Sequence, residues 1–203
     1  VHFIKKGWLR RNRIWSNKQE QLISLPCKGV SSNKLINEIE VATKHPDYFK
    51  IKKSIIQSYA KASEFKKLRP LLEQIFDDHQ CTLAEFNTRS ITAILNYLDI
   101  RCELISSSEF APETRGLERS DRLISITKKL SSSTYINSLG GKDLYDKAYF
   151  SSKDIELQFL DPNLPVFPDG IRKGQEMNFS MIDTLMWNGV QETKQILKEY
   201  SLS

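Results

Sequence analysis

Two stretches of this sequence combine residue types that bind anions. The first, residues 135–142 (YINSLGGK), ends in Gly140, Gly141 and Lys142. It reads as the end of a strand, a tight turn, and a helix that begins at or after Lys142. Backbone N–H groups at such a junction point outward at the positive end of a helix dipole, where phosphate and carboxylate groups bind. The spacing fits neither GxxxxGK[ST] nor GxGxxG, and an ordinary turn with a surface lysine is the alternative.

The second stretch is the basic run at residues 5–14 (KKGWLRRNRI). Lys6, Arg11 and Asn12 supply hydrogen-bond donors, and the fork of an arginine matches the geometry of carboxylate and phosphate. Trp8 offers a flat ring that can stack on a base or a sugar. The alternative is a solvated basic hairpin anchored by one tryptophan.

Charge is distributed unevenly along the chain. The net charge is +5, and six basic residues precede the first acidic residue, Glu20. Residues 44–69 add eight basic residues against Asp47 and Glu64. Such clustering suits an anionic partner, either a phosphorylated small molecule or nucleic acid, although solvated basic faces are also common.

Composition and scattered motifs bound the class of protein. The chain has 203 residues, 39% apolar and 27% charged, which is typical of one globular domain. No apolar stretch approaches the length of a membrane span, and no signal peptide is visible, so we expect a cytoplasmic protein. Three cysteines without a CxxC pair predict buried thiols and no disulfides. The three histidines lack metal-ligand spacing and no GxSxG motif occurs, so we expect neither a metal nor another cofactor.

The order of the predicted elements defines the fold class. Strands are expected at residues 1–4, 21–27, 35–41, 101–105, 134–137 and 155–160. Helices are expected from Pro46 to Tyr59, over 65–76 with a bend or restart at Pro70, and after the capping-box pair Thr82 and Glu85. Further helices are expected at 122–130 and 143–150. A final helix is expected to begin at residues 179–183 and to stop at Gly189. Alternation in the second half predicts an α/β fold: a mostly parallel sheet with crossover helices, in a single domain (residues 1–203) with a helical middle segment.

Several motifs together resemble the WbqC-like protein family of bacterial surface-polysaccharide and O-antigen assembly. The similarity covers residues 2–14 (HFIKKGWLRRNRI), 58–62 (SYAKA), 121–124 (DRLI), 134–145 (TYINSLGGKDLY) and 180–189 (SMIDTLMWNG). Relatives carry an upstream strand and helix with a Gln-Pro-x-[YF] motif, so we expect this chain to lack that segment. His2 stands where many relatives have Gln.

The resemblance implies an enzyme of polysaccharide biosynthesis that transfers an acyl or aminoacyl group to an amino sugar carried on a nucleotide or lipid diphosphate. The diphosphate would lie against Ser138, Gly140, Gly141 and Lys142, with Lys6, Trp8, Arg11 and Asn12 on its other side. Asp183 or Tyr145 would accept or orient the proton that the attacking amine loses, although Asp183 also fits a simple helix-capping role. A nucleic-acid-binding module that uses the basic N-terminal face and a non-catalytic scaffold of a glycan-assembly complex are the alternatives.

Overall fold

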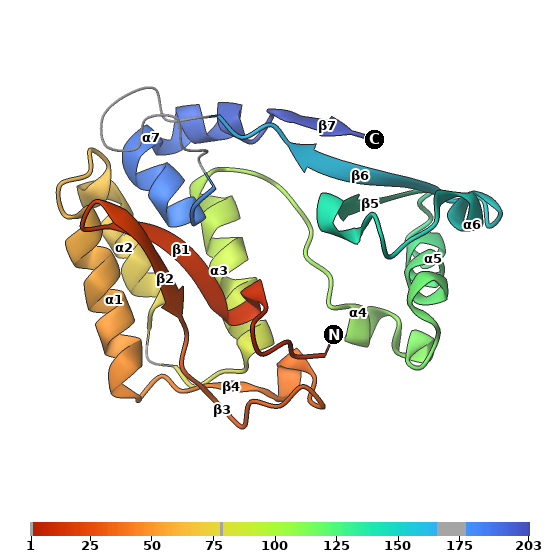
Figure 1. The fold of residues 1–203 in the computed structure, drawn as a ribbon, viewed down its shortest axis with the longest axis horizontal. Coiled ribbons are helices and arrows are strands. Elements are labelled where there is room, and N and C mark those ends of the chain that lie inside the picture. The colour runs from red at the N-terminus through yellow and green to blue at the C-terminus, as the bar shows by residue number, and fades with distance from the viewer. Residues whose placement is uncertain (1, 78, 166–177) are drawn as a thin grey trace. The chain divides into compact units, whose positions relative to one another are not determined.

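The computed structural model describes residues 2–77, 79–165 and 178–203 (Figure 1). The chain forms two units, each with its own hydrophobic core. Unit 1 contains Val1–Cys102 and Pro165–Ile196, and unit 2 contains Glu103–Leu164 and Leu197–Ser203. The α/β class is confirmed, because both units combine helices with paired strands.

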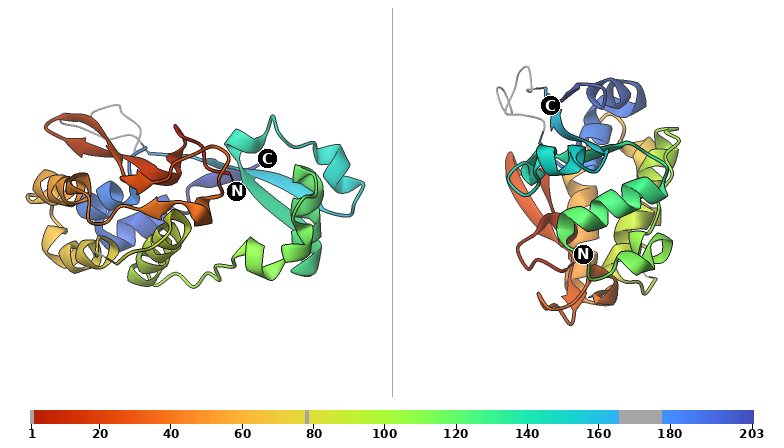
Figure 2. Two further views of the ribbon diagram at one scale, coloured as in Figure 1. Left: turned by 90° about the horizontal axis from the view of Figure 1, so that it is seen from below. Right: turned by 90° about the vertical axis from the view of Figure 1, so that its right-hand side faces the viewer.

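The first paired strands of unit 1 form a hairpin. Strand β1 (Arg11–Ser16) runs antiparallel to β2 (Gln19–Ser24). The two turn residues, Asn17 and Lys18, have φ angles of 51° and 63°, the left-handed values that match the twist of a hairpin. Figure 2 shows this hairpin lying along one side of helices α1, α2 and α3, whose bounds follow below.

Three strand predictions in this part of the chain need correction. Of the predicted strand at 1–4, residue 1 lies outside the described residues, and residues 2–4 contribute only an isolated bridge from His2 to Leu35. The predicted strand at 21–27 is divided between β2 and the short β3 (Cys27–Lys28). The predicted strand at 35–41 is interrupted by the 3-10 helix η2 (Ile36–Glu38), because the Glu38 carboxylate accepts the Leu35 N–H at 2.7 Å and curls the backbone. The strand that does form within this range is the two-residue β4 (Glu40–Val41), which pairs with β3.

The helices of unit 1 follow the predicted pattern. They are α1 (Pro46–Tyr59), α2 (Phe65–Ile75), α3 (Leu83–Tyr97) and α7 (Met181–Ile196). Helix α2 continues through Pro70, so the expected restart does not occur. Gly189 has φ 68° and kinks α7, which confirms an interruption at this residue although helical turns resume beyond it. The buried side chains of these helices surround Phe3 and Ile14 to form the unit 1 core.

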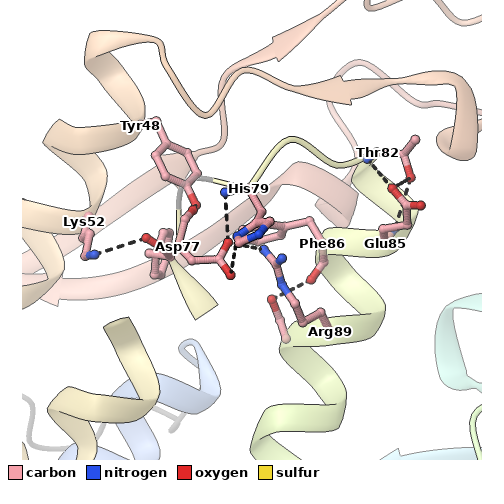
Figure 3. Close-up of polar contacts among 10 residues, drawn as sticks. Tyr48, Lys52, Asp77, His79, Thr82, Glu85, Phe86 and Arg89 are labelled. Atoms are coloured by element: carbon pink, nitrogen blue, oxygen red, sulfur yellow. Dashed lines mark hydrogen bonds and ion pairs between the residues drawn. The ribbon is translucent and has the colours of Figure 1, made fainter. Parts of the chain in front are cut away.

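One polar cluster ties the end of α2 to α1 and α3 (Figure 3). Tyr48 Oη donates a hydrogen bond of 2.5 Å to the backbone carbonyl of Asp77. The Asp77 carboxylate lies 2.9 Å from an Nη atom of Arg89, and Lys52 Nζ donates to the Phe76 carbonyl at 3.1 Å. These contacts satisfy carbonyl groups at the C-terminal end of α2 and fix the chain before α3.

Unit 2 is a three-stranded sheet packed against short helices. Strand β5 (Thr134–Ser138) pairs in parallel with β6 (Glu156–Pro162), and β7 (Tyr200–Leu202) pairs antiparallel with β6. The helical elements are α4 (Ser107–Phe110), η3 (Pro112–Thr114), α5 (Arg119–Lys129), η4 (Leu139–Gly141) and α6 (Lys147–Ser151). The core consists of buried side chains from α5, α6 and β6.

The structure corrects two predicted elements in the second half of the chain. Residues 101–105 do not form a strand, and all five are exposed. The helix predicted at 143–150 begins only at Lys147, because Asp146 caps it by accepting the Ala148 N–H at 2.9 Å.

The sheet arrangement is mixed rather than mostly parallel. Within the described residues, β5 and β6 form a parallel pair, joined by the predicted crossover through α6. The pairs β1–β2, β3–β4 and β6–β7 are antiparallel. The difference arises at the N-terminus, where a two-residue turn forces neighbouring strands to run in opposite directions.

Candidate functional site: the Trp8 hollow

The predicted site residues belong to both units. Lys6, Trp8, Arg11, Asn12 and Asp183 lie in unit 1. The predicted turn residues Ser138, Gly140, Gly141 and Lys142, with Tyr145, lie in unit 2. The idea that both sets bind one ligand therefore stays a prediction.

Trp8 is held at the surface by the turn that precedes it. The Gly7 N–H donates to the Ile4 carbonyl at 2.9 Å and closes this turn. A Cβ atom on residue 7 would lie only 3.0 Å from the Ile4 Cβ, so the close approach favours glycine. Trp8 then opens the 3-10 helix η1 (Trp8–Arg10) that leads into β1, and the tryptophan is 59% exposed. An indole this exposed lies outside the unit 1 core and is accessible for a ligand within this unit.

Two arginines of β1 lie against the Trp8 ring. The Arg11 Cζ atom is 5.6 Å and the Arg13 Cζ atom 5.2 Å from the ring centroid. Both distances are within cation–π range, where each contact contributes about 0.5–1 kcal/mol at an exposed site. Because residues 11 and 13 share one face of the strand, the strand period of two brings both guanidinium groups to the same indole.

These three residues border an open hollow of about 360 Å³. We call it the Trp8 hollow, and its lining residues are Trp8, Arg11, Asn12, Arg13, Asn178 and Phe179. Its volume lies at the lower end of the roughly 300–1,000 Å³ that small-molecule sites occupy. The hollow therefore joins two cations, two amides and two aromatic rings, a set that suits an anionic ligand with a flat or sugar-like part.

The donors of the hollow are partly engaged with the protein itself. Arg11 Nε donates to the Gly7 carbonyl at 3.2 Å, which uses one of the five N–H groups of a guanidinium. An Nη atom of Arg13 lies 3.5 Å from the Glu20 carboxylate on β2. Asn12 Oδ1 accepts the Arg13 N–H at 2.8 Å. Lys6 is exposed in the preceding turn and does not line the hollow.

Asp183 lies inside unit 1 rather than at its surface. Its exposed fraction is 2%, and Oδ1 accepts a 2.6 Å hydrogen bond from Tyr59 Oη, which is also fully buried. The Asp183 N–H donates to the Ser180 carbonyl at 2.8 Å in the first turn of α7. Asp183 thus follows the helix start rather than caps it, since the Ser180 hydroxyl accepts the Ile182 N–H at 3.3 Å.

The glycine turn of unit 2 differs from the predicted geometry. Gly140 and Gly141 belong to η4, and α6 has only five residues, beginning at Lys147. The helix dipole that motivated an anion site therefore does not start at Lys142. Gly141 is buried, and a Cβ atom there would lie 2.7 Å from Asn137 Nδ2, whereas nothing lies within 4 Å of such an atom at Gly140. Lys142 and Ser138 are exposed.

Tyr145 packs beside this turn. Its ring meets Phe150 edge-on at 6.1 Å, and its half-buried side chain contacts the unit 2 core. Tyr135 stacks on Phe150 at 5.9 Å, and burial raises the pKa of the Tyr135 hydroxyl, with a smaller contribution from Tyr145. Tyr145 therefore has a clear packing role, and its predicted catalytic role stays a prediction.

Sequence reasoning missed four residues that build or support the hollow. They are Arg13, Tyr59, Asn178 and Phe179. The strand period was the available signal for Arg13, because it lies two residues after Arg11. No local signal links Phe179 or Tyr59 to β1, since their contacts join segments far apart in the sequence.

In the part of the chain that the structure describes, no group of three or more His, Cys, Asp or Glu side chains is arranged to hold a metal ion. Cys27, Cys81 and Cys102 lie outside any disulfide; Cys102 is exposed, so the prediction of buried thiols is wrong for this residue, whereas burial raises the pKa of both Cys27 and Cys81. None of the described helices has the length and apolar character needed to span a bilayer.

Comparison with known proteins identifies the family. The model of the WbqC-like protein family matches residues 1–195, nearly the whole chain. This chain therefore belongs to the WbqC-like family. No curated protein and no solved structure gives a significant match.

Proposed function

We propose that the Trp8 hollow binds the diphosphate of a nucleotide-linked or lipid-linked amino sugar during surface-polysaccharide assembly. One observation carries this proposal: an exposed tryptophan with two arginine side chains against its ring, beside an open hollow. The polysaccharide context is what the resemblance to the WbqC-like family implies, and the chain belongs to that family.

The chemistry of the hollow favours a ligand with an anionic and a planar or sugar part. Guanidinium groups bind phosphate through parallel, charge-assisted hydrogen bonds, which are about twice as strong as neutral ones. The faces of Trp8 and Phe179 accept the apolar side of a sugar ring or the plane of a base. Asn12 and Asn178 add donors and acceptors that suit hydroxyl groups.

The proposed reaction is transfer of an acyl or aminoacyl group to the sugar amine. The amine nitrogen forms a bond to the acyl carbon, the bond from that carbon to the donor's leaving group breaks, and the amine proton passes to a base and then to the leaving group. Asp183 and Tyr145 are the predicted proton acceptors. Since Asp183 is buried and bonded to Tyr59, the proposal rests on the binding face rather than on either residue.

Titration calorimetry with UDP-linked amino sugars and with UDP alone tests this function. We expect W8A and the double variant R11A/R13A each to weaken binding by roughly tenfold or more, since about 1.4 kcal/mol corresponds to a factor of ten. The matched control is R69A, because Arg69 is an exposed arginine of unit 1 that pairs with Glu73 on α2. The proposal is wrong if the wild type binds none of these probes, or if all variants bind equally.

A nucleic-acid ligand is the main competing outcome. Its binding would depend steeply on salt, because phosphate contacts release counterions. We therefore include a single-stranded oligonucleotide at low and physiological salt. If the oligonucleotide still binds at physiological salt and W8A weakens that binding, the hollow is a nucleic-acid site.

A further inference from the structure

The two walls of the Trp8 hollow come from segments far apart in the sequence. One wall is β1, with Arg11, Asn12 and Arg13, and the other is Asn178 and Phe179, just before α7. We infer that Tyr59 and Asp183 are a positioning pair that holds these walls together; this inference rests on the proposed function of the hollow. Both residues are buried, and neither lines the hollow.

The Tyr59 hydroxyl connects α1 to both walls. Its oxygen accepts the backbone N–H of Trp15 on β1 at 3.2 Å. The same hydroxyl donates its proton to Asp183 Oδ1 at 2.6 Å, the short distance typical of a bond to a carboxylate. A second link lies next to it, where Ser58 Oγ donates to Ser16 Oγ at 2.8 Å. One hydroxyl group therefore bonds the hairpin and α7 at the same time.

The start of α7 is bonded directly to the arginine strand. The Ser180 N–H donates to the Arg13 carbonyl at 2.8 Å, and the Phe179 ring meets the Trp15 ring edge-on at 5.7 Å. Asp183 holds Ser180 in place, because its own N–H donates to the Ser180 carbonyl. A shift of Asp183 would therefore move Ser180 and Phe179, and with them the position of the Arg13 backbone.

This geometry assigns Asp183 a role that acts through Tyr59. A buried carboxylate outside the lining of the hollow does not contact a ligand that binds there. The Asp183 carboxylate can nevertheless fix the distance between the two arginines and Phe179. This distance determines whether the two walls of the hollow contact the same ligand. Ligand affinity should then depend on a hydroxyl group that never touches the ligand.

Replacing Tyr59 by Phe tests the pair, and the same change at Tyr48 is the matched control. Both tyrosines are fully buried on α1, and each hydroxyl donates one hydrogen bond. The Tyr48 bond ends on the Asp77 carbonyl (Figure 3). Neither Tyr48 nor Asp77 lines the hollow. The readouts are thermal unfolding, affinity for a UDP-linked amino sugar, and amide hydrogen exchange at Trp15 and Ser180 without ligand.

We expect both variants to lower the unfolding temperature, and Y59F more than Y48F, because the Tyr59 hydroxyl also accepts the Trp15 N–H and bonds a buried carboxylate. Only Y59F should weaken ligand binding, by roughly tenfold, and only Y59F should speed exchange at Trp15 and Ser180. The inference is overturned if Y59F changes neither affinity nor exchange, or if Y48F changes both equally. If Y59F does not fold, the milder S180A removes one bond at the start of α7 and should weaken binding about two- to threefold, within the range of one neutral hydrogen bond.

The exchange measurement separates this inference from the proposed function. If the wild type binds no sugar nucleotide, the proposed function fails, yet faster exchange in Y59F alone would still establish the pair. If the wild type binds and Y59F binds equally well, the function holds and the positioning role fails.

Discussion

Tyr59 and Asp183 are 124 residues apart in the chain, and their side chains meet at 2.6 Å in the interior of unit 1. Between them the chain builds most of unit 2. The return of the chain at α7 thus completes unit 1, and it does so next to the strand that carries the half-buried Arg11 and Arg13. Local chemistry at either residue alone suggests a capping aspartate and a core tyrosine.

Substitutions of Asp183 should separate a positioning role from a catalytic one. D183N keeps an oxygen that can accept the Tyr59 hydrogen bond, whereas D183A leaves a buried hydroxyl without this acceptor. We expect D183A to destabilise unit 1 by about 1–3 kcal/mol and to weaken ligand binding. D183N should bind within about threefold of the wild type. Denaturant titration and calorimetry measure both quantities, and equal loss of affinity in the two variants would contradict a positioning role.

The two glycines of the η4 turn should respond differently to alanine. At Gly141 a Cβ atom would lie 2.7 Å from Asn137 Nδ2, and Asn137 Oδ1 accepts the Ser138 N–H at 2.7 Å. G141A should therefore cost about 1–3 kcal/mol through overpacking. G140A is the control, since nothing lies within 4 Å of its new methyl group. Thermal unfolding compares them, and a G141A protein as stable as G140A would show that the Asn137 side chain moves freely.

Lys142 tests whether the unit 2 turn binds an anion. If the turn is part of the ligand site, K142A should weaken binding of a UDP-linked amino sugar by roughly tenfold. Folding stability should change little, because the side chain is exposed. The control is K128A, an exposed lysine near the end of α5. Equal affinities of K142A and K128A would show that the turn has a packing role and does not bind the ligand.

The capping box of α3 should make stability depend on pH. The Thr82 backbone N–H and hydroxyl bond to the Glu85 carboxylate, and these bonds lower the pKa of Glu85. A lowered pKa means that the unfolded chain binds more protons than the folded chain as the pH falls. The stabilisation from these bonds is therefore complete above about pH 4.5, near the pKa of glutamate in the unfolded chain, and it decreases as the pH falls further. The difference in unfolding temperature between wild type and E85Q should thus shrink from pH 7 to about pH 3. A constant difference would contradict this assignment.

The prediction of a single domain leads to a test of cooperativity. The two units have separate cores, but the chain passes between them three times. A single domain predicts one calorimetric transition whose van't Hoff and calorimetric enthalpies agree. G141A, in unit 2, should then lower the unfolding temperature of the whole protein. Two transitions, of which G141A shifts only one, would make the units independent domains.

The sequence predicted the helix boundaries correctly where one or two residues determine the local backbone conformation. Pro46 begins α1, the pair of Thr82 and Glu85 begins α3, and Gly189 interrupts α7 as expected. The hairpin of β1 and β2 was not assigned, because its turn is Asn17-Lys18 rather than an Asn-Gly or Asp-Gly pair. Lysine with a positive φ is uncommon, so the sequence carries little sign of this turn.

The candidate site was predictable only in part for the same reason. Trp8, Arg11 and Asn12 lie within five residues, so their common location followed from the chain itself. Phe179 and Tyr59 reach β1 through tertiary contacts, which no spacing in the sequence encodes. At the glycine turn the local pattern was misleading. It predicted a helix that begins at or after Lys142, whereas the helix begins at Lys147 after the capping residue Asp146.

The side chains on the two faces of β1 have different surroundings, so substitutions on one face have different consequences from substitutions on the other. Ile14 and Ser16 are buried on one face of the strand, whereas Arg11 and Arg13 border the Trp8 hollow from the other. If the hollow binds a ligand as proposed, substitutions on the arginine face would alter ligand preference and leave the buried face packed against α1. A one-residue insertion in β1 would instead exchange the two faces and place a guanidinium in the core. In this chain, a point substitution on the arginine face therefore leaves the buried face of β1 intact, whereas a change in strand length does not.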